Sequence, residues 1–309
     1  MSNLSGAASS NKLTLSKFNR YKWVYLLFLP MFAFAFVFDY MPMYGIQIAF
    51  KGFRPADGIW GSQWVGLRYF IRMFREPTFL RIFRNTLYIS FLKIGIIFPS
   101  GIIFALLLNE IYSSTAKRVY QTISYLPHFM SWIVIAGLIR DVTAIDGPIN
   151  FIMERFFKMS PLVFLANSRV FVPVLVISDL WHSMGWGSII YLAAITGISK
   201  ELYESADMDG AGRIRKIVSI TLPSILPVIL IMFILRLGSV LNAGFEQIFN
   251  LYNPLVYEVA DIIDTYTYRV GLMQMSFSYS TAIGLFKNVV GLILVLTTNY
   301  FSRRVEGAI

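Results

Sequence analysis

The sequence predicts an all-α polytopic membrane protein with six transmembrane helices. Of its 309 residues, 56% are hydrophobic and only 14% are charged, whereas an ordinary soluble domain carries about 25% charged residues. The apolar residues form long runs, each near the ~20 residues that a helix needs to cross a bilayer core. Counted in order, these runs indicate a single helical bundle.

Six runs have a suitable length. They are Tyr21–Phe38, Thr86–Asn109, Val119–Ile139, Val170–Ile195, Ile217–Leu241 and Ala282–Phe301. The first is not a cleaved signal peptide, because its apolar part is too long and no small-residue cleavage site follows it. Residues 1–16 are rich in Ser, Asn and Ala, so we expect residues 1–20 to be a disordered cytoplasmic tail and residues 21–309 to be the transmembrane domain.

The placement of lysine and arginine indicates that both termini are cytoplasmic. With the N-terminus inside, the inner and outer segments hold equal numbers of these residues. The inner segments are about half as long, so their density of positive charge is about twofold higher, as the positive-inside rule requires of short loops. The loop of residues 197–216 then lies in the cytoplasm.

The first outer segment, Asp39–Arg84, alternates arginines with apolar and aromatic residues between Arg68 and Arg84. This pattern predicts an amphipathic helix that lies at the membrane interface and is broken near Pro77. Trp60 and Trp64 suit the level of the lipid headgroups. We favour a surface anchor, and the alternative is a gate or a docking surface for an outside partner.

The loop 197–216 has the sequence pattern of a short helix and a turn that connect two spans. Ser199 can cap a helix that begins at Lys200, and the small side chains of Ser205 and Ala206 allow another backbone to approach closely. Gly210 permits the turn that ends this helix. An amphipathic helix of this kind suits a hydrophobic groove on a partner protein.

This loop resembles the EAA loop of ABC-type importer permeases, which their ATPase grips. The family pattern is Glu-Ala-Ala, a Gly six positions after the Glu, and then Leu-Pro. Here Glu204, Gly210 and Leu222-Pro223 keep that spacing, with Ser205 in place of the first Ala. The resemblance implies that the residues contacting the ATPase are Leu202, Tyr203, Glu204, Ser205, Ala206, Asp207, Asp209 and Gly210.

The resemblance covers nearly the whole chain from about Tyr21 onward. Pro42-Met43-Tyr44-Gly45, Leu126-Pro127-His128-Phe129 and the stretch from Trp181 to Tyr191 are similar to a branch of MalF-type carbohydrate permeases that includes LplB and alginate permeases. This implies a type I importer (MetI-like) fold with five core spans and a leading span that wraps a partner. It also implies a second permease subunit, two cytoplasmic ATPase subunits, an extracellular solute-binding protein and an oligosaccharide substrate.

The chain lacks the motifs of a self-contained pump or enzyme. No G-x-x-x-x-G-K-[ST] loop is present, so we expect no cofactor in this chain, with ATP and Mg²⁺ held by the partner ATPase. With no cysteine and two histidines, we expect neither a disulfide nor a metal site. The net charge of +10 fits membrane lipid and topology better than nucleic acid.

Charged residues inside spans are costly and usually face the bundle interior. Lys93, Asp179, Arg236 and Lys287 are such residues. We expect structural roles for Arg236 and Lys287, which lie near span ends. We also expect Gln247 and Asn242, just beyond the fifth span, to line an outer vestibule.

Two polar and aromatic patches are candidates for the substrate path. Asp179 and His182 share one face of the fourth span, and aromatic faces beside hydrogen-bonding groups suit a sugar. We favour ordinary hydrogen bonding and packing between helices for these residues, and the alternative is that they line the path of a sugar. The candidate residues are Tyr125, His128, Trp132, Asp179, Trp181, His182 and Trp186.

Other classes of function remain as alternatives. The chain could be a permease for another small polar solute, or a secondary transporter that works alone. A secondary transporter predicts an internal repeat and paired intramembrane acids, but no repeat is visible and Asp179 is the one clear mid-span acid. A membrane enzyme needs paired carboxylates, and the loop pattern already accounts for Asp207 and Asp209.

Overall fold

The computed structural model describes residues 15–306, and within that range the chain is almost entirely helical. Its one sheet there is a two-stranded antiparallel ribbon, β1 (Lys51–Gly52) with β2 (Gln63–Trp64). The all-α prediction is therefore confirmed. The predicted disordered tail falls mainly on residues 1–14, which lie outside the described residues.

The helices follow in chain order. The first half contains α1 (Leu15–Ala35), η1 (Phe36–Tyr40), α2 (Met41–Met43), η2 (Tyr44–Phe50), α3 (Gly58–Gly61), α4 (Arg68–Arg75), α5 (Pro77–Asn109), α6 (Ser114–Tyr125), η3 (Leu126–Phe129), α7 (Trp132–Val142) and α8 (Pro148–Phe157). The second half contains η4 (Phe164–Ala166), α9 (Ser168–Thr196), α10 (Lys200–Met208), α11 (Arg213–Lys216), η5 (Ile217–Thr221), α12 (Leu222–Gly238), α13 (Phe245–Leu251), η6 (Pro254–Val256), α14 (Tyr257–Ala260), α15 (Ile263–Tyr268), η7 (Arg269–Met273) and α16 (Phe277–Glu306).

Four continuous helical stretches among the described residues are long and apolar enough to cross a membrane. They are Tyr21–Phe50, Pro77–Asn109, Arg213–Gly238 and Phe277–Tyr300. The helices from Ser114 to Val142 make a fifth if they are counted as one broken span. Helix α9 covers the fourth predicted span and is long enough, but its polar residues leave it outside this apolar set. The count of six spans is thus not confirmed.

The third predicted span, Val119–Ile139, is not one straight helix. It is divided into α6 with η3 and then α7, which are bent by 102° relative to each other. Pro127 has no N–H to donate to a helix, and the backbone is extended at Met130 and Ser131. The Ser131 side chain then accepts a hydrogen bond from the Val134 N–H and caps α7. These local features restart the helix in a new direction.

Helices α5 and α9 form the centre of the molecule and lie very close together. A Cβ atom on Gly101 would stand 3.1 Å from the backbone of Gly187, and one on Gly185 would overlap the Ser124 carbonyl. Glycine therefore lets α5 and α6 pack against α9. Apolar clusters along this axis join α9 to α13 in the middle and α5 to α12 at one end.

The segment predicted to be a surface anchor is partly buried instead. The helix does break at Glu76–Pro77 as expected, but Met73, Phe79 and Ile82 are fully buried in a cluster with α15 and α16. The predicted interfacial helix is therefore wrong for these three residues, because α15 and α16 cover the face that sequence reasoning assigned to lipid.

Hydrogen bonds reinforce the cluster that Met73, Phe79 and Ile82 form with α15 and α16. The Tyr279 hydroxyl donates to Glu76 Oε2 at 2.6 Å, and the Tyr266 hydroxyl lies 3.4 Å from Glu76 Oε1. Burial and then the nearby Glu76 carboxylate raise the pKa of the Tyr266 phenol. Tyr266 therefore remains a hydrogen-bond donor at neutral pH and helps to hold α4 and α5 on α15.

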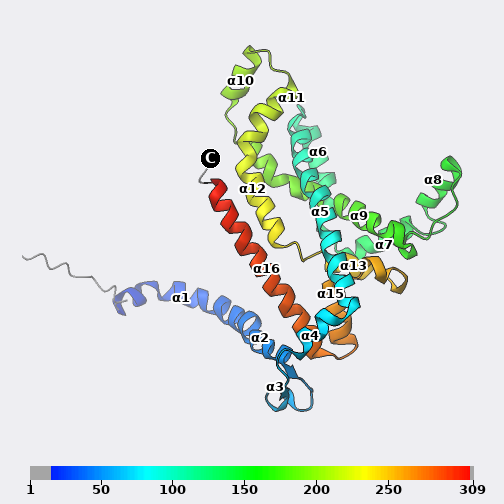
Figure 1. The fold of residues 1–309 in the computed structure, drawn as a ribbon. Coiled ribbons are helices and arrows are strands. Elements are labelled where there is room, and N and C mark those ends of the chain that lie inside the picture. Colours follow the sequence, from blue (N-terminus) through cyan, green and yellow to red (C-terminus); the bar gives the residue numbers. More distant parts are fainter. Residues whose placement is uncertain (1–14, 307–309) are drawn as a thin grey trace, which may run out of the picture.

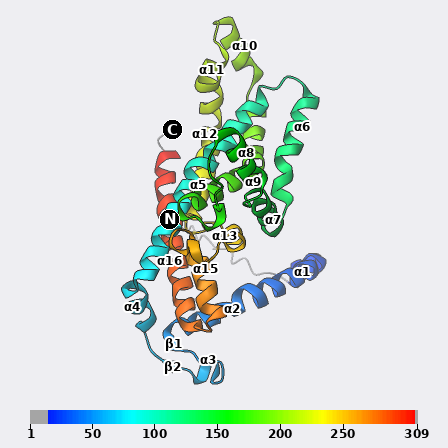
Figure 2. The ribbon, with the colours of Figure 1, turned by 90° about the vertical axis from the view of Figure 1, so that its right-hand side faces the viewer.

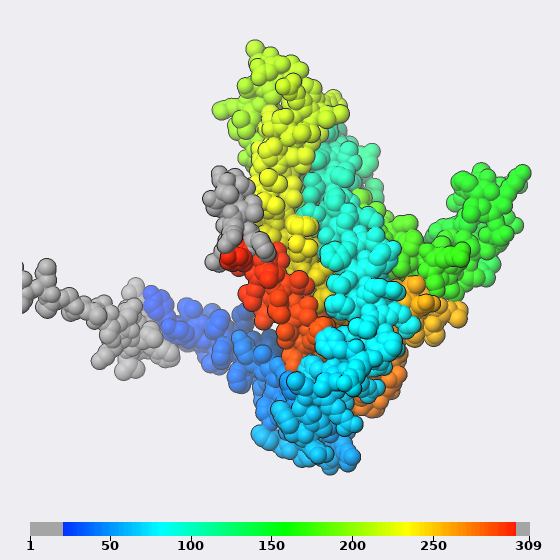
Figure 3. Space-filling view, viewed as in Figure 1, coloured from blue at the N-terminus to red at the C-terminus, as the bar shows by residue number. Residues whose placement is uncertain are grey.

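Helix α1 stands apart from this bundle. It projects sideways in the ribbon and is separated from α16 in the space-filling view (Figure 1, Figure 3). None of the most apolar part of Tyr21–Phe50 is buried. The segment is joined to the bundle at its far end, where η2 packs on α16 and Ala49 is fully buried.

Candidate coupling segment and substrate path

The loop 197–216 forms one tip of the molecule. In two perpendicular views α10 and α11 lie at one end, whereas α3 and the β1–β2 ribbon lie at the opposite end (Figure 1, Figure 2). The two ends are linked by the long helix α5, by α12 and by α16. Helix α12 continues from α11 without a break in helical structure, and a turn at residues 209–212 joins α10 to this continuous helix.

The local sequence explains the shape of this tip. The Ser199 hydroxyl accepts a hydrogen bond from the Glu201 N–H at 3.3 Å and caps α10. At the other end Gly210 has φ of +71°, which L side chains rarely adopt. This turn lets the Ala211 N–H reach the Ala206 carbonyl at 2.9 Å. The predicted capped helix and glycine turn are both confirmed.

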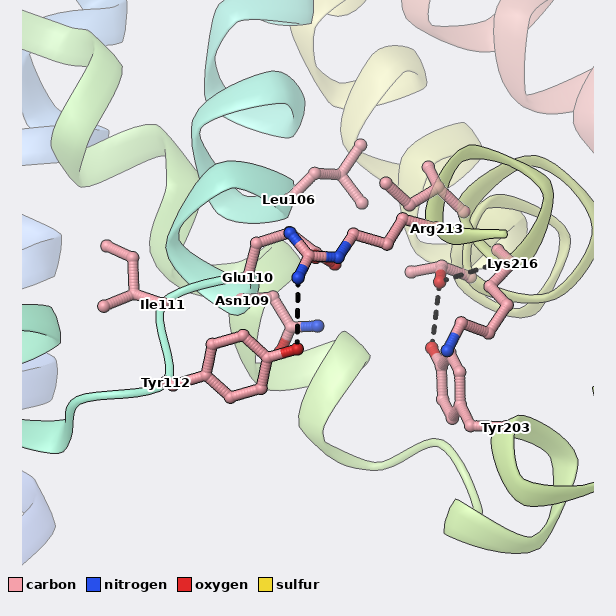
Figure 4. A pocket seen from close by; sticks show the side chains of 10 residues that line it. Leu106, Asn109, Glu110, Ile111, Tyr112, Tyr203, Arg213 and Lys216 are labelled. Carbon is pink, nitrogen blue, oxygen red and sulfur yellow. Dashed lines mark hydrogen bonds between the residues drawn. The ribbon is translucent and has the colours of Figure 1, made fainter. Parts of the chain in front are cut away.

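The inward face of α10 is fixed to the spans by polar contacts. The hydroxyls of Tyr203 and Thr221 lie 2.9 Å apart (Figure 4). Lys216 Nζ also lies 2.7 Å from Asp207 Oδ1. The Arg213 guanidinium also lies over the Tyr112 ring, 5.8 Å from its centroid. These contacts surround a pocket of about 290 Å³ between the end of α5, helix α10 and the segment formed by α11 and η5.

The outward face of this tip is exposed and partly apolar. Leu202 is 50% exposed, Ile214 is 78% exposed and Met208 is 89% exposed. Glu204 and Ser205 are exposed on the same helix as Leu202, whereas Tyr203 and Ala206 are half-buried toward the spans. The predicted coupling residues therefore divide into an outward set that a partner can reach and an inward set that anchors the helix.

A buried polar network lies near the centre of the molecule. Lys93, the middle residue of α5, has its ammonium 3.0 Å from Asp179 on α9 and 2.9 Å from the Ala243 carbonyl. It also donates to the Gln247 side chain, whose amide donates to the Leu175 carbonyl at 2.7 Å. Gln247 is fully buried, so its predicted place in an outer vestibule is wrong.

Beside this network the two predicted aromatic patches come together. The His128 ring stacks on Trp186 with centroids 4.5 Å apart and planes at 8°. His182 lies 5.2 Å from His128 and 4.5 Å from Trp132, again between ring centroids. The bend after α6 brings His128 and Trp132 onto α9, although they are far from it in sequence.

A cavity of about 360 Å³ opens next to the His128–Trp186 stack. Nδ1 of His128 is buried and makes no hydrogen bond to any residue that the structure describes. The cavity thus combines an aromatic surface with polar groups, as a sugar site does. Its lining consists of Ile97, Phe98, Gly101, His128, Ser183, Trp186, Gly187, Tyr191, Met232, Leu235, Arg236 and Ser239.

The other candidate path residues lie outside this cavity. Asp179 and His182 are buried behind its wall, where the Ser183 hydroxyl donates to Asp179 Oδ1 at 2.9 Å. Trp181 is 49% exposed, and neither Trp181 nor Tyr125 is a lining residue. Sequence reasoning missed Ser183 and Tyr191, which carry no charge to attract attention, and gave Arg236 only a structural role.

Comparison with known proteins agrees with this architecture. Residues 97–307 match the family described as binding-protein-dependent transport system inner membrane component. The chain belongs to this family. Members are transport subunits rather than enzymes, and within residues 21–300, whose side chains the structure describes, no group of three or more His, Cys, Asp or Glu side chains could hold a metal ion.

Several members of this inner membrane component family resemble the chain over nearly its whole length. The polygalacturonan/rhamnogalacturonan transport system permease protein YteP of Bacillus subtilis is 45% identical, over 95% of this chain and 91% of the relative. Protein LplB of the same organism is 43% identical, over 94% of this chain and 92% of its own.

Solved structures of this family also resemble the chain. A bacterial ABC transporter that imports the acidic polysaccharide alginate has a chain with a TM-score of 0.87 and 39% identity, covering 94% of this chain and 98% of that one. A second structure shows that transporter with a pentasaccharide-bound periplasmic protein, at a TM-score of 0.86, 39% identity and coverage of 94% and 97%.

Proposed function

We propose that this protein is the permease subunit of an ATP-driven importer that receives an oligosaccharide from an extracellular binding protein. The exposed, capped helix α10 at the tip of α12 carries this proposal, since it offers a partner an apolar face joined directly to a span. The importers of polygalacturonan and alginate among the relatives support an oligosaccharide as the cargo.

The importer consists of this chain, a second permease subunit, two ATPase subunits and the binding protein. ATP and Mg²⁺ bind the ATPase, and both termini of this chain face the cytoplasm. Residues 21–309 form the transmembrane domain, and residues 197–216 form the coupling loop. Closure of the ATPase pair pushes α10, and the spans then move as rigid bodies between outward-open and inward-open states.

Leu202, Glu204, Ser205, Met208 and Asp209 form the outward contact with the ATPase. Tyr203 and Asp207 hold α10 against the spans, through Thr221 and Lys216 respectively. The cavity beside His128 and Trp186 lies on the path of the sugar, with Asp179, His182 and Trp132 supporting its wall.

Uptake by the assembled importer in proteoliposomes tests this proposal. We expect uptake of an oligosaccharide that requires both ATP inside and the binding protein outside. Glu204→Lys should reduce uptake to background while the complex still assembles and the binding protein still docks, because a reversed charge disrupts a contact made at the ATPase groove. Arg155→Gln, an exposed change on α8, is the matched control and should leave uptake unchanged.

Two results would contradict the proposal. Uptake by this chain alone would exclude a dependence on a separate ATPase. Because the chain has no cysteine, Leu202→Cys introduces a single reporter, and its labelling by a membrane-impermeant thiol reagent in intact cells would place α10 outside.

A further inference from the structure

Three cations, Lys93, Arg236 and Lys287, are predicted from the sequence to lie within spans, and only Arg236 has no acidic partner among the described residues. Lys93 pairs with Asp179 at 3.0 Å, and Lys287 pairs with Asp264 at 2.6 Å. Arg236 lies on α12, is exposed, and forms no ion pair with any residue from 21 to 300, the range over which the structure describes side chains. The charge of Arg236 is thus left free for a group that this chain does not provide.

The sequence suggests that Arg236 lies near a span end, but the structure places it beside the middle of α5, and an unpaired charge at such depth is costly. It lines a small cleft together with Lys93, the middle residue of the long helix α5. Arginine does not give up its proton in proteins, so it cannot avoid this cost by becoming neutral. Charged residues at such depth generally mark an ion or substrate pathway.

The surroundings of Arg236 favour an anion. No aspartate or glutamate lines the 360 Å³ cavity that Arg236 shares with His128 and Trp186. The buried carboxylate behind the cavity wall, Asp179, is already held by Lys93 and by Ser183. A planar guanidinium binds a carboxylate through two parallel hydrogen bonds.

The same cavity carries an aromatic surface for a sugar ring. Trp186 is 45% exposed while its ring stacks on His128, so one part of the indole is covered and another part is available. A sugar offers an apolar C–H face to such a ring. A sugar bearing a carboxylate could place its C–H face on the indole and its carboxylate on the guanidinium of this cavity at the same time.

We propose that Arg236 is a specificity-determining residue that selects oligosaccharides carrying carboxylate groups. Arg236 binds a uronate carboxylate while Trp186 contacts the sugar ring, so the cavity passes acidic oligosaccharides in preference to neutral ones. This inference rests on the proposed function, because it assigns a substrate class to the same transport path.

The test uses the complete importer in proteoliposomes with a panel of short probes. The acidic probes are oligogalacturonides and oligomannuronates; the neutral probes are the methyl esters of the same oligosaccharides and arabino-oligosaccharides. We expect Arg236→Gln to lower uptake of the acidic probe about tenfold, the effect of losing one charge-assisted bond. Uptake of the methyl ester should change by less than about twofold, and Arg236→Lys should restore part of the acidic uptake.

Arg155→Gln is again the matched control, since it removes an exposed arginine that lines none of the cavities described above. The affinity of the binding protein for each probe is measured separately, so that its preference is not assigned to the permease. The ratio of acidic to neutral uptake is then the quantity that reports on Arg236.

Each other outcome overturns the inference. Equal losses for acidic and neutral probes would mean that Arg236 pairs with an acid on the second permease subunit or with lipid. Unchanged uptake, or a wild-type importer that carries only neutral probes, would exclude carboxylate recognition and leave the proposed function intact. A wild-type complex that carries none of the probes would instead reject the proposed function.

Discussion

The pairing of Lys93 with Asp179 shows which properties of a single residue can be predicted from the sequence and which cannot. Both residues are recognisable in the sequence as costly charges within spans, but they lie on different helices and nothing in the sequence indicates that they meet. The interaction depends on α5 and α9 approaching closely, which Gly101 permits because a Cβ there would stand 3.1 Å from the α9 backbone. The presence of these charges within spans could be predicted from the sequence, whereas their pairing could be recognised only from the folded structure.

A double substitution can separate the structural role of this pair from a direct role in transport. Asp179→Asn leaves a buried ammonium without its counter-charge, a change that costs about 3–5 kcal/mol for a buried ion pair. We therefore expect a markedly lower thermal unfolding midpoint for the assembled complex in detergent. Adding Lys93→Met should recover most of that loss, because the unpaired charge is removed.

Lys287 offers a comparison for this experiment, because its ion pair with Asp264 is part-buried rather than fully buried. Asp264→Asn should cause a smaller shift of the unfolding midpoint than Asp179→Asn, since water still reaches the remaining charge. A double variant at 93 and 179 that is no more stable than Asp179→Asn alone would contradict the pairing argument.

At the scale of elements, the sequence predicted helix α10 well and the third span poorly. The ends of helix α10 are set by a serine cap and a glycine turn. Both are short-range features that can be recognised in the sequence. The third span depends on whether Pro127 and Ser131 bend or interrupt a helix. Hydropathy could not decide this question, because the two helices on either side of the 102° bend are, when taken together, long and apolar enough for one span.

Gly210 and Gly212 provide a matched pair for testing the turn after α10. Gly210 has φ of +71°, whereas Gly212 has φ of −70°, and no atom obstructs a Cβ at either position. Gly210→Ala should cost about 1–2 kcal/mol in backbone strain and lower uptake severalfold by misplacing α10. Gly212→Ala should leave uptake unchanged, since alanine adopts that conformation freely.

Equal uptake by the two alanine variants would show that the conformation of this turn is unimportant for coupling. Equal losses would indicate instead that both glycines are needed for close contact with a partner. Uptake and ATP hydrolysis should be measured on the same preparations, so that a loss of assembly is not mistaken for a loss of coupling.

At the scale of the whole molecule, the sequence predicted a membrane bundle with a handle at one end but not which surfaces are covered. The arginine-rich segment from Arg68 to Arg84 resembles an interfacial anchor because its pattern is amphipathic. Its apolar face is in fact covered by α15 and α16, which lie far downstream in the chain. The same limitation applies to Gln247, whose burial depends on α5 and α9 together.

The isolation of α1 also bears on how cells control the number of copies of this protein. A chain that has not found its partner presents a long helix whose most apolar part is not buried by the rest of the chain, and such an exposed apolar helix marks an orphan subunit. We expect surplus copies to be degraded faster, and pulse-chase measurements with and without the second permease gene should show a shorter half-life in its absence. An unchanged half-life would mean that lipid alone satisfies this helix, and that the supply of the subunit is balanced at synthesis rather than by destruction.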